Sequence, residues 1–123
     1  MSISVGPHRL TNRALLAPMS GVTDEPFRNL AHGLGAGMVV SEMVASEEIV
    51  RARPTARARG ELGFGTERTA VQLAGREARW MAEAVRFCAG QGARIIDINF
   101  GCPARKVTNG LSGSALMRDP DHA

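Results

Sequence analysis

The sequence has few aromatic residues, few cysteines and no long apolar run. Aromatic side chains make up 4% of the 123 residues and tyrosine is absent, so we expect an aliphatic core. Two cysteines do not make the disulfide framework of a small secreted domain. No apolar run approaches the roughly 20 residues that span a bilayer, and the N-terminus lacks the apolar segment of a secretory signal. These absences predict a cytoplasmic protein without a membrane partner.

The positive charge is mild and is carried almost wholly by arginine. The formal net charge is +3, and Lys106 is the only lysine. Arginine suits planar contacts with phosphates and bases, and one group of arginines could form such a surface: Arg51, Arg53, Arg57 and Arg59. Because solvated charged surfaces are common, RNA binding through this group is a secondary hypothesis.

Short apolar runs alternate with amphipathic stretches along the chain. The runs predict strands at Ala14–Ala17, Met38–Ser41, Thr69–Leu73 and Ile95–Ile98. The stretches predict helices from Thr23 or Asp24 to Gly35 or Gly37, at about Ser46–Arg53 before Pro54, and at Glu77–Ala89. A loop is predicted at Gly60, Gly63 and Gly65, and another helix start at Asp119. Strands and helices in this order are typical of parallel strands joined by crossovers.

Two of the predicted helices carry an apolar face. The first places Phe27, Leu30, Ala31 and Leu34 at helical spacing. The last places Trp80, Met81, Ala84, Val85 and Cys88 together. We therefore expect Cys88 to be a buried structural thiol.

Four strand–helix units amount to half of a (β/α)8 barrel, whose usual size is about 250 residues. The chain is therefore expected to be the N-terminal half of a TIM barrel, truncated before its remaining strands. The alternative is a small open doubly wound sheet. Its usual phosphate-binding signatures are missing, because the sequence contains neither G-x-G-x-x-G nor G-x-x-x-x-G-K-[ST].

Polar and special residues follow the predicted strands at their carboxyl ends, which converge on one mouth in a parallel barrel. These residues are Pro18, Met19 and Ser20 after the first strand, Glu42 and Met43 after the second, Gln72 late in the third, and Asn99 to Lys106 after the fourth. A buried amide at Gln72 needs hydrogen-bond partners. Either a neighbouring backbone group or a heteroaromatic ring could supply them, and the same alternatives hold for Asn99.

Cys102 lies where the last apolar strand breaks off. Gly101 before it lets the backbone turn sharply or approach a ligand, and Pro103 after it fixes the chain. The thiol is therefore expected to be held at the mouth of the barrel. A cysteine has a reference pKa of about 8.5, so at neutral pH it is mostly protonated and can donate a proton.

Four ordered segments of the chain carry a family resemblance. They are APMSGVTDEPFR at 17–28, SEM at 41–43, VQLAG at 71–75 and DINFGCPARKV at 97–107. This series resembles the tRNA-dihydrouridine synthases, and most of all the bacterial B-type branch associated with nitrogen-regulation operons. The resemblance implies a flavin-mononucleotide (FMN) barrel, of which residues 1–123 would be the N-terminal part. The rest of the barrel and a C-terminal helical domain that helps to grip tRNA would then lie outside this chain.

The resemblance also implies a reaction and roles for the residues. The C5=C6 bond of a uridine in tRNA would be reduced to dihydrouridine, with electrons from NADPH and without a metal. Cys102 matches the family's proton donor to C5. Asn99 would orient flavin and uracil, and Gln72 would bond the flavin edge. Three residues would pack or hydrogen-bond against the flavin ring: Pro18, Met19 and Ser20.

Three other interpretations stay open. A related flavin barrel could act on a free pyrimidine or an enoate, although the run from Gly101 to Val107 favours the tRNA enzymes. A thiol hydrolase would need a histidine partner, but His8, His32 and His122 lie in no recognisable motif. A non-catalytic RNA-binding module would depend on the arginine group described above.

Overall fold

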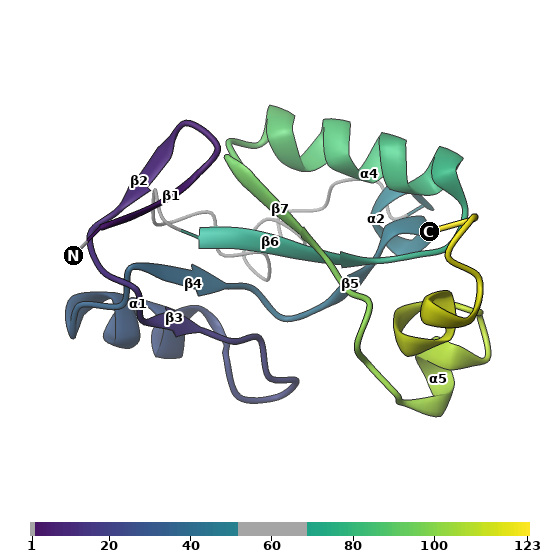
Figure 1. The fold of residues 1–123 in the computed structure, drawn as a ribbon, viewed down its shortest axis with the longest axis horizontal. Coiled ribbons are helices and arrows are strands. Elements are labelled where there is room, and N and C mark those ends of the chain that lie inside the picture. Colours follow the sequence, from purple (N-terminus) through teal and green to yellow (C-terminus); the bar gives the residue numbers. More distant parts are fainter. Residues whose placement is uncertain (1, 52–68) are drawn as a thin grey trace.

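The structure, a computed structural model, describes residues 2–51 and 69–123 of the chain. It begins with an antiparallel hairpin of β1 (Ile3–Val5) and β2 (His8–Leu10), which the sequence patterns do not predict. The turn between them uses Gly6, whose φ of 55° favours glycine. Each strand has three residues, too few to show an apolar period. Figure 1 shows this hairpin near the end of the sheet where β6 and β7 begin.

The predicted strands form one parallel sheet. β3 (Leu15–Leu16), β4 (Met38–Val40), β6 (Thr69–Ala74) and β7 (Ile95–Ile98) lie side by side in sequence order (Figure 1). Every pairing along this order is parallel. The prediction of four parallel strands is therefore confirmed, although the first strand is shorter than expected.

The second strand is interrupted by a bulge. β5 (Val44–Ala45) pairs in parallel with the same edge of β6 as β4, because β7 occupies the other edge. Val40 pairs with Ala70 and Val44 pairs with Leu73, so the chain advances four residues from β4 to β5 while β6 advances three. The hydroxyl of Ser41 fills the gap by accepting a hydrogen bond from Gln72 N–H at 3.0 Å. Bulges of this kind redirect side chains next to functional sites.

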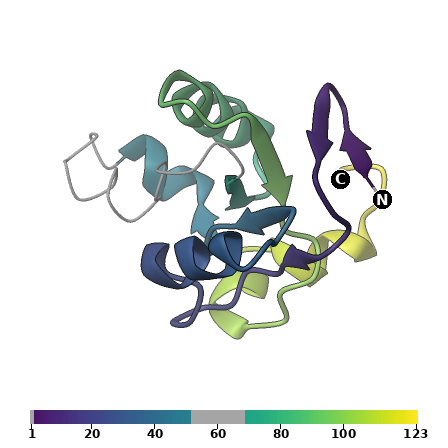
Figure 2. The same cartoon turned by 90° about the vertical axis from the view of Figure 1, so that its left-hand side faces the viewer.

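Three helices lie along one side of the curved sheet (Figure 2): α1 (Glu25–Gly33), α2 (Ser46–Arg51) and α4 (Ala78–Gly90). α1 begins as predicted, because the side chain of Asp24 accepts a hydrogen bond from Phe27 N–H at 3.0 Å. α4 also agrees with its prediction. The predicted end of α2 at Arg53 and Pro54, and the glycine loop at 60–65, lie outside the described residues.

The two predicted apolar faces have different outcomes. On α4, Ala84 and Cys88 are fully buried, as expected. On α1, by contrast, Phe27 is 39% exposed, Leu30 63% and Leu34 81%. The helical spacing of these residues is confirmed, but within the described ranges their face stays largely open to solvent.

The hydrophobic core lies between the sheet and the helices α2 and α4. Its buried members come from three elements and are Ile49, Val71, Leu73, Ala84 and Cys88; the side chains packed around them include Val44, Met81, Val85, Phe87 and Ile96. The core is aliphatic, as the composition predicts. Because successive strand residues point to opposite faces, Gln72 points away from this core.

After β7 the chain forms α5 (Arg105–Thr108) and a 3-10 helix (Gly113–Arg118), beyond the end where the sheet's strands finish (Figure 1). The helix predicted to start at Asp119 is seen as one turn, in which the Asp119 carbonyl accepts from His122 N–H and Ala123 N–H. The sequence patterns do not predict the 3-10 helix, because its short segment has no repeating pattern.

The sheet order separates the two fold classes that the sequence left open. Doubly wound sheets place helices on both faces and reverse their strand order at a switch point. Here β3, β4, β6 and β7 follow the sequence without reversal, and the connecting helices α1, α2 and α4 share one side. The fold is α/β with parallel strands and matches the N-terminal part of a TIM barrel. Within the described ranges, no helix is long and apolar enough to cross a membrane.

Candidate active site

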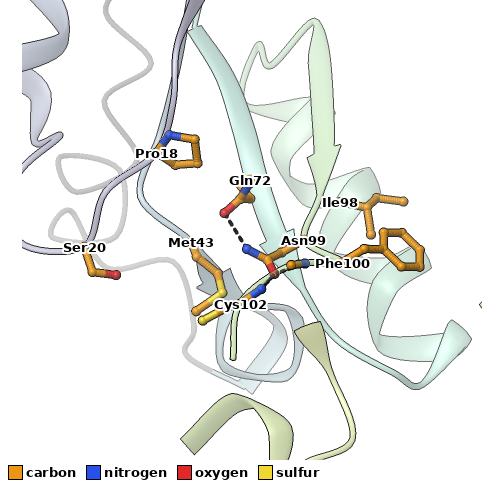
Figure 3. Close-up of a pocket in the computed structure, with 9 residues that line it drawn as sticks. Pro18, Ser20, Met43, Gln72, Ile98, Asn99, Phe100 and Cys102 are labelled. Carbon is orange, nitrogen blue, oxygen red and sulfur yellow. Dashed lines mark hydrogen bonds between the residues drawn. The ribbon is translucent and has the colours of Figure 1, made fainter. Parts of the chain in front are cut away.

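A hollow of about 430 Å³ opens at the carboxyl ends of the strands. It is lined by Pro18, Ser20, Met43, Gln72, Ile98, Asn99, Phe100, Gly101 and Cys102 (Figure 3). Five of the six residues expected at the site therefore lie together. The sixth, Met19, does not line this hollow.

Gln72 is the most buried polar side chain of the hollow, at 7% exposed. Its Nε2 donates to Asp97 Oδ2 at 2.5 Å, and its Oε1 accepts from Asn99 Nδ2 at 2.9 Å. The amide is thus held by side chains rather than by the backbone. Because a primary amide has two N–H donors and two lone pairs, one of each is left for a ligand.

Asn99 connects Gln72 to the cysteine loop. Its Oδ1 accepts hydrogen bonds from the backbone N–H of Gly101 at 3.2 Å and of Cys102 at 2.9 Å. Its own backbone N–H donates to the Leu73 carbonyl at 2.9 Å and so continues the sheet. Asparagine commonly folds such turns through its own side chain. We call the series Cys102 N–H, Asn99, Gln72 and Asp97 the amide chain.

The backbone of Cys102 is held on both sides. Its N–H belongs to the amide chain, and its carbonyl accepts from Ser114 N–H at 3.0 Å. Gly113 makes this contact possible, because a Cβ there would lie 2.6 Å from the Cys102 carbonyl oxygen. Its φ of 60° also favours glycine. The expected fixed position of Cys102 is thus observed, with part of the support coming from the 3-10 helix.

The loop after β3 is folded around Thr23. The fully buried Thr23 hydroxyl accepts from Met19 N–H at 2.8 Å, and the Met19 carbonyl accepts from the N–H groups of Val22 and Thr23 at 3.0 Å. The side chain of Met19 is 41% exposed. The loop instead places Pro18 and Ser20 along the hollow (Figure 3).

Two charged residues hold this loop, one from α1 and one from the β4–β5 bulge. Arg28 is 1% exposed and donates to the Thr23 carbonyl at 2.6 Å. Burial lowers the pKa of Arg28, and the nearby carboxylates of Glu25, Glu42 and Asp24 act in the opposite direction. Glu42 Oε1 also accepts from Gly21 N–H at 2.5 Å. The β4–β5 bulge therefore supports the loop as well as the hollow.

The strand-end pattern predicts Met43 at the mouth without a role, and it does not predict a role for Asp97. Met43 lies in the bulge and lines the hollow. Asp97 lies in the apolar strand β7, directly opposite Gln72. Its charge within an apolar run was a visible signal, but its partner became evident only from the strand register.

The other candidate residues lie elsewhere. Cys88 is a free, fully buried cysteine whose pKa is raised by burial, which confirms it as a core thiol. Arg51 pairs with Glu47 at 2.6 Å and lies 5.5 Å from the Trp80 ring centre, while Arg53, Arg57 and Arg59 lie outside the described residues. Over residues 2–51 and 69–123, no group of three His, Cys, Asp or Glu side chains could hold a metal ion.

Comparisons with known proteins identify the family of the chain. A family model described as "Dihydrouridine synthase (Dus)" matches residues 15–123. A probable tRNA-dihydrouridine synthase of Rhodobacter capsulatus is 60% identical over 125 residues, which cover 100% of this chain and 38% of that protein. A probable tRNA-dihydrouridine synthase of Rhizobium leguminosarum is 64% identical over 113 residues, which cover 91% of this chain and 35% of that protein.

The B-type branch is represented too. The tRNA-dihydrouridine synthase B of Pseudomonas syringae is 48% identical over 118 residues, covering 96% of this chain and 35% of that protein. The chain thus spans 35 to 38% of the length of these relatives. The family match from residue 15 to the last residue, together with these identities, shows that the chain belongs to the dihydrouridine synthase family.

Proposed function

We propose that the whole protein reduces the C5=C6 bond of uridines in tRNA to 5,6-dihydrouridine, with FMN as its cofactor and NADPH as its electron donor. The relatives are named tRNA-dihydrouridine synthases, which supports the substrate and the reaction. The chain matches the N-terminal part of a TIM barrel, and it contains the loop that carries Cys102. The observation that carries the proposal is the position of Cys102, held at the edge of a hollow beside Gln72 and Asn99.

The donors and acceptors of the hollow fit one edge of a flavin ring. Gln72 retains one N–H and one lone pair, which match the alternating acceptors and donors of such an edge. Pro18 and Met43 add apolar surface for the flat face of a ring. A volume of about 430 Å³ is within the usual range of ligand pockets. None of the described residues that line the hollow is cationic, so the cofactor's phosphate would be held elsewhere.

The chain's own residues would orient the substrate and deliver a proton. When bound, the reduced flavin supplies the hydride that adds to C6. The Cys102 thiol gives its proton to C5, and the thiolate is then reprotonated from solvent. Asn99 holds the backbone of the cysteine loop, which would limit the directions from which the thiol reaches C5. A positioned acid of this kind contributes about 10²- to 10⁴-fold to the rate.

Mass spectrometry of tRNA nucleosides tests the proposal. Deleting the gene should remove dihydrouridine from at least one tRNA position, and the whole gene should restore it. The complementing protein, once purified, should be yellow and release FMN. Unchanged dihydrouridine at every position after deletion would refute the activity, and a colourless active protein would refute the cofactor.

A further inference from the structure

Asp97 is hydrogen-bonded to a residue of the hollow without lining the hollow itself. Its Oδ2 accepts the hydrogen bond from Gln72 Nε2, and it lies opposite Gln72 in the parallel register of β6 and β7. The residues around the hollow do not include Asp97. Gln72 is therefore the hydrogen-bonded connection between this carboxylate and the hollow.

We propose that Asp97 is a positioning residue that fixes the amides of Gln72 and Asn99 and, through them, the place of Cys102. Its consequence for turnover rests on the proposed function. Its consequence for the position of the thiol does not, because that position can be measured without any reaction on tRNA.

The hydrogen bonds of the amide chain all run in one direction. Cys102 N–H donates to Asn99 Oδ1, Asn99 Nδ2 donates to Gln72 Oε1, and Gln72 Nε2 donates to Asp97 Oδ2. A backbone N–H can only donate and an ionised carboxylate can only accept. The two ends of the chain therefore select one orientation for both amides. A bond to a carboxylate is also stronger than one between neutral groups.

Loss of the carboxylate would release Gln72 from this arrangement. Its Nε2–H would lack an acceptor in a side chain that is 7% exposed, and a buried unpaired donor is costly. The amide would then turn toward the open hollow to reach water. That movement breaks the bond with Asn99, whose Oδ1 holds the N–H groups of Gly101 and Cys102.

A double-variant cycle tests this directly. Gln72→Glu places a carboxylate against Asp97, and two facing carboxylates repel each other. Adding Asp97→Asn removes the repulsion, because the introduced amide can donate to the new carboxylate, which still accepts from Asn99. Both changes nearly preserve side-chain size. Asp97→Leu and Asp97→Asn form a second pair, in which only the asparagine can still accept from Gln72.

Two readouts are taken on the whole protein. The first is the iodoacetamide alkylation rate of the Cys102 peptide, followed by mass spectrometry, with the buried Cys88 peptide as an internal reference. The second is kcat for dihydrouridine formation, separated from KM. Misplacing a reacting group by about 1 Å can cost about 10²-fold, so Gln72→Glu and Asp97→Leu should lower kcat on that scale. Both should change Cys102 alkylation several-fold.

The rescue decides the outcome. The kcat of the double variant should be about tenfold or more above the kcat of Gln72→Glu. This recovery lies within the coupling energies typical of residues in one hydrogen-bond network. Asp97→Asn alone should retain most of the parent's alkylation rate and kcat. Equal values for Gln72→Glu and the double variant in both readouts would overturn the proposal. If Asp97→Leu does not fold, the double-variant cycle still decides. If the parent protein makes no dihydrouridine, the proposed function fails, while alkylation still tests Asp97.

Discussion

The two faces of β6 are both buried, but they are built differently. On the helix side, Val71 and Leu73 pack against α2 and α4 without exposure to solvent. On the other side, Gln72 is 7% exposed and is held by hydrogen bonds to Asp97 and Asn99. One strand thus contributes to the core with one set of alternating residues and to the site with the other.

The apolar face of β6 mainly sets the stability of the fold, and the hydrogen-bonded face mainly sets the positions of the site residues. Apolar packing has no preferred direction, so its loss lowers stability roughly in proportion to the volume removed. Hydrogen bonds have direction, so a lost partner leaves another group unpaired and moves the chain that it held. The two cysteines repeat the comparison, because Cys88 lies in the core and Cys102 beside the polar face.

The largest free-energy change is expected on the apolar face. Leu73→Ala should lower the free energy of unfolding of the whole protein by about 3 kcal/mol, because the cavity would lie in a fully buried site. Urea unfolding measures the change. Dihydrouridine formation per folded molecule should stay close to that of the parent at a temperature far below unfolding. A clear loss of activity per folded molecule in Leu73→Ala would contradict the separation of the two faces.

Replacing Cys102 is expected to lower activity while flavin stays bound. Cys102→Ala should leave flavin bound and reducible by NADPH, because neither step uses the thiol. Dihydrouridine formation should fall by about 10²-fold, the scale for losing a positioned proton donor. Cys102→Ser should rescue poorly, since a hydroxyl is a much weaker acid than a thiol. Flavin content, anaerobic flavin reduction and tRNA nucleoside analysis measure the three steps separately.

The matched control for this prediction is Cys88→Ala. It removes a thiol of the same size from the apolar face and should leave turnover unchanged per folded molecule. Loss of flavin in Cys102→Ala would make Cys102 structural, and full activity would remove it from the mechanism.

A smaller effect is expected for Gln72→Leu. The change keeps approximate size but leaves Asp97 and Asn99 without their shared partner. Stability should fall by about 1 to 2 kcal/mol, and flavin occupancy should fall as well. Flavin release measured by absorbance, beside thermal unfolding, checks both. Normal flavin content in a destabilised protein would mean that Gln72 acts as a support alone.

Much of the fold was predictable because each strand of the parallel sheet is an apolar run followed by a break. The hairpin of β1 and β2 was not, since three residues show no period. The bulge at Ser41 was hidden as well, because it depends on how β4 and β5 share the edge of β6. The exposed face of α1 shows that a period predicts a helix better than it predicts what covers it.

The site was predictable to the same extent and for a related reason. Gln72, Asn99 and Cys102 follow from the rule that the carboxyl ends of parallel strands meet. Asp97 and Gly113 follow from contacts between segments, which no local pattern encodes.

The smallest predicted effect concerns the pH dependence of stability. Burial raises the pKa of the Cys88 thiol, whereas a cysteine in the unfolded chain titrates near a pKa of about 8.5. Below that pH both states keep the proton, so this contribution to stability is constant. Above it the unfolded state loses the proton while the folded state retains it, so the free energy of unfolding decreases as pH rises. Urea unfolding at several pH values between about 7 and 10 measures this decrease. Cys88→Ala should show a shallower decrease than the parent. Parallel curves for the parent and Cys88→Ala would mean that the core thiol makes no contribution of this kind.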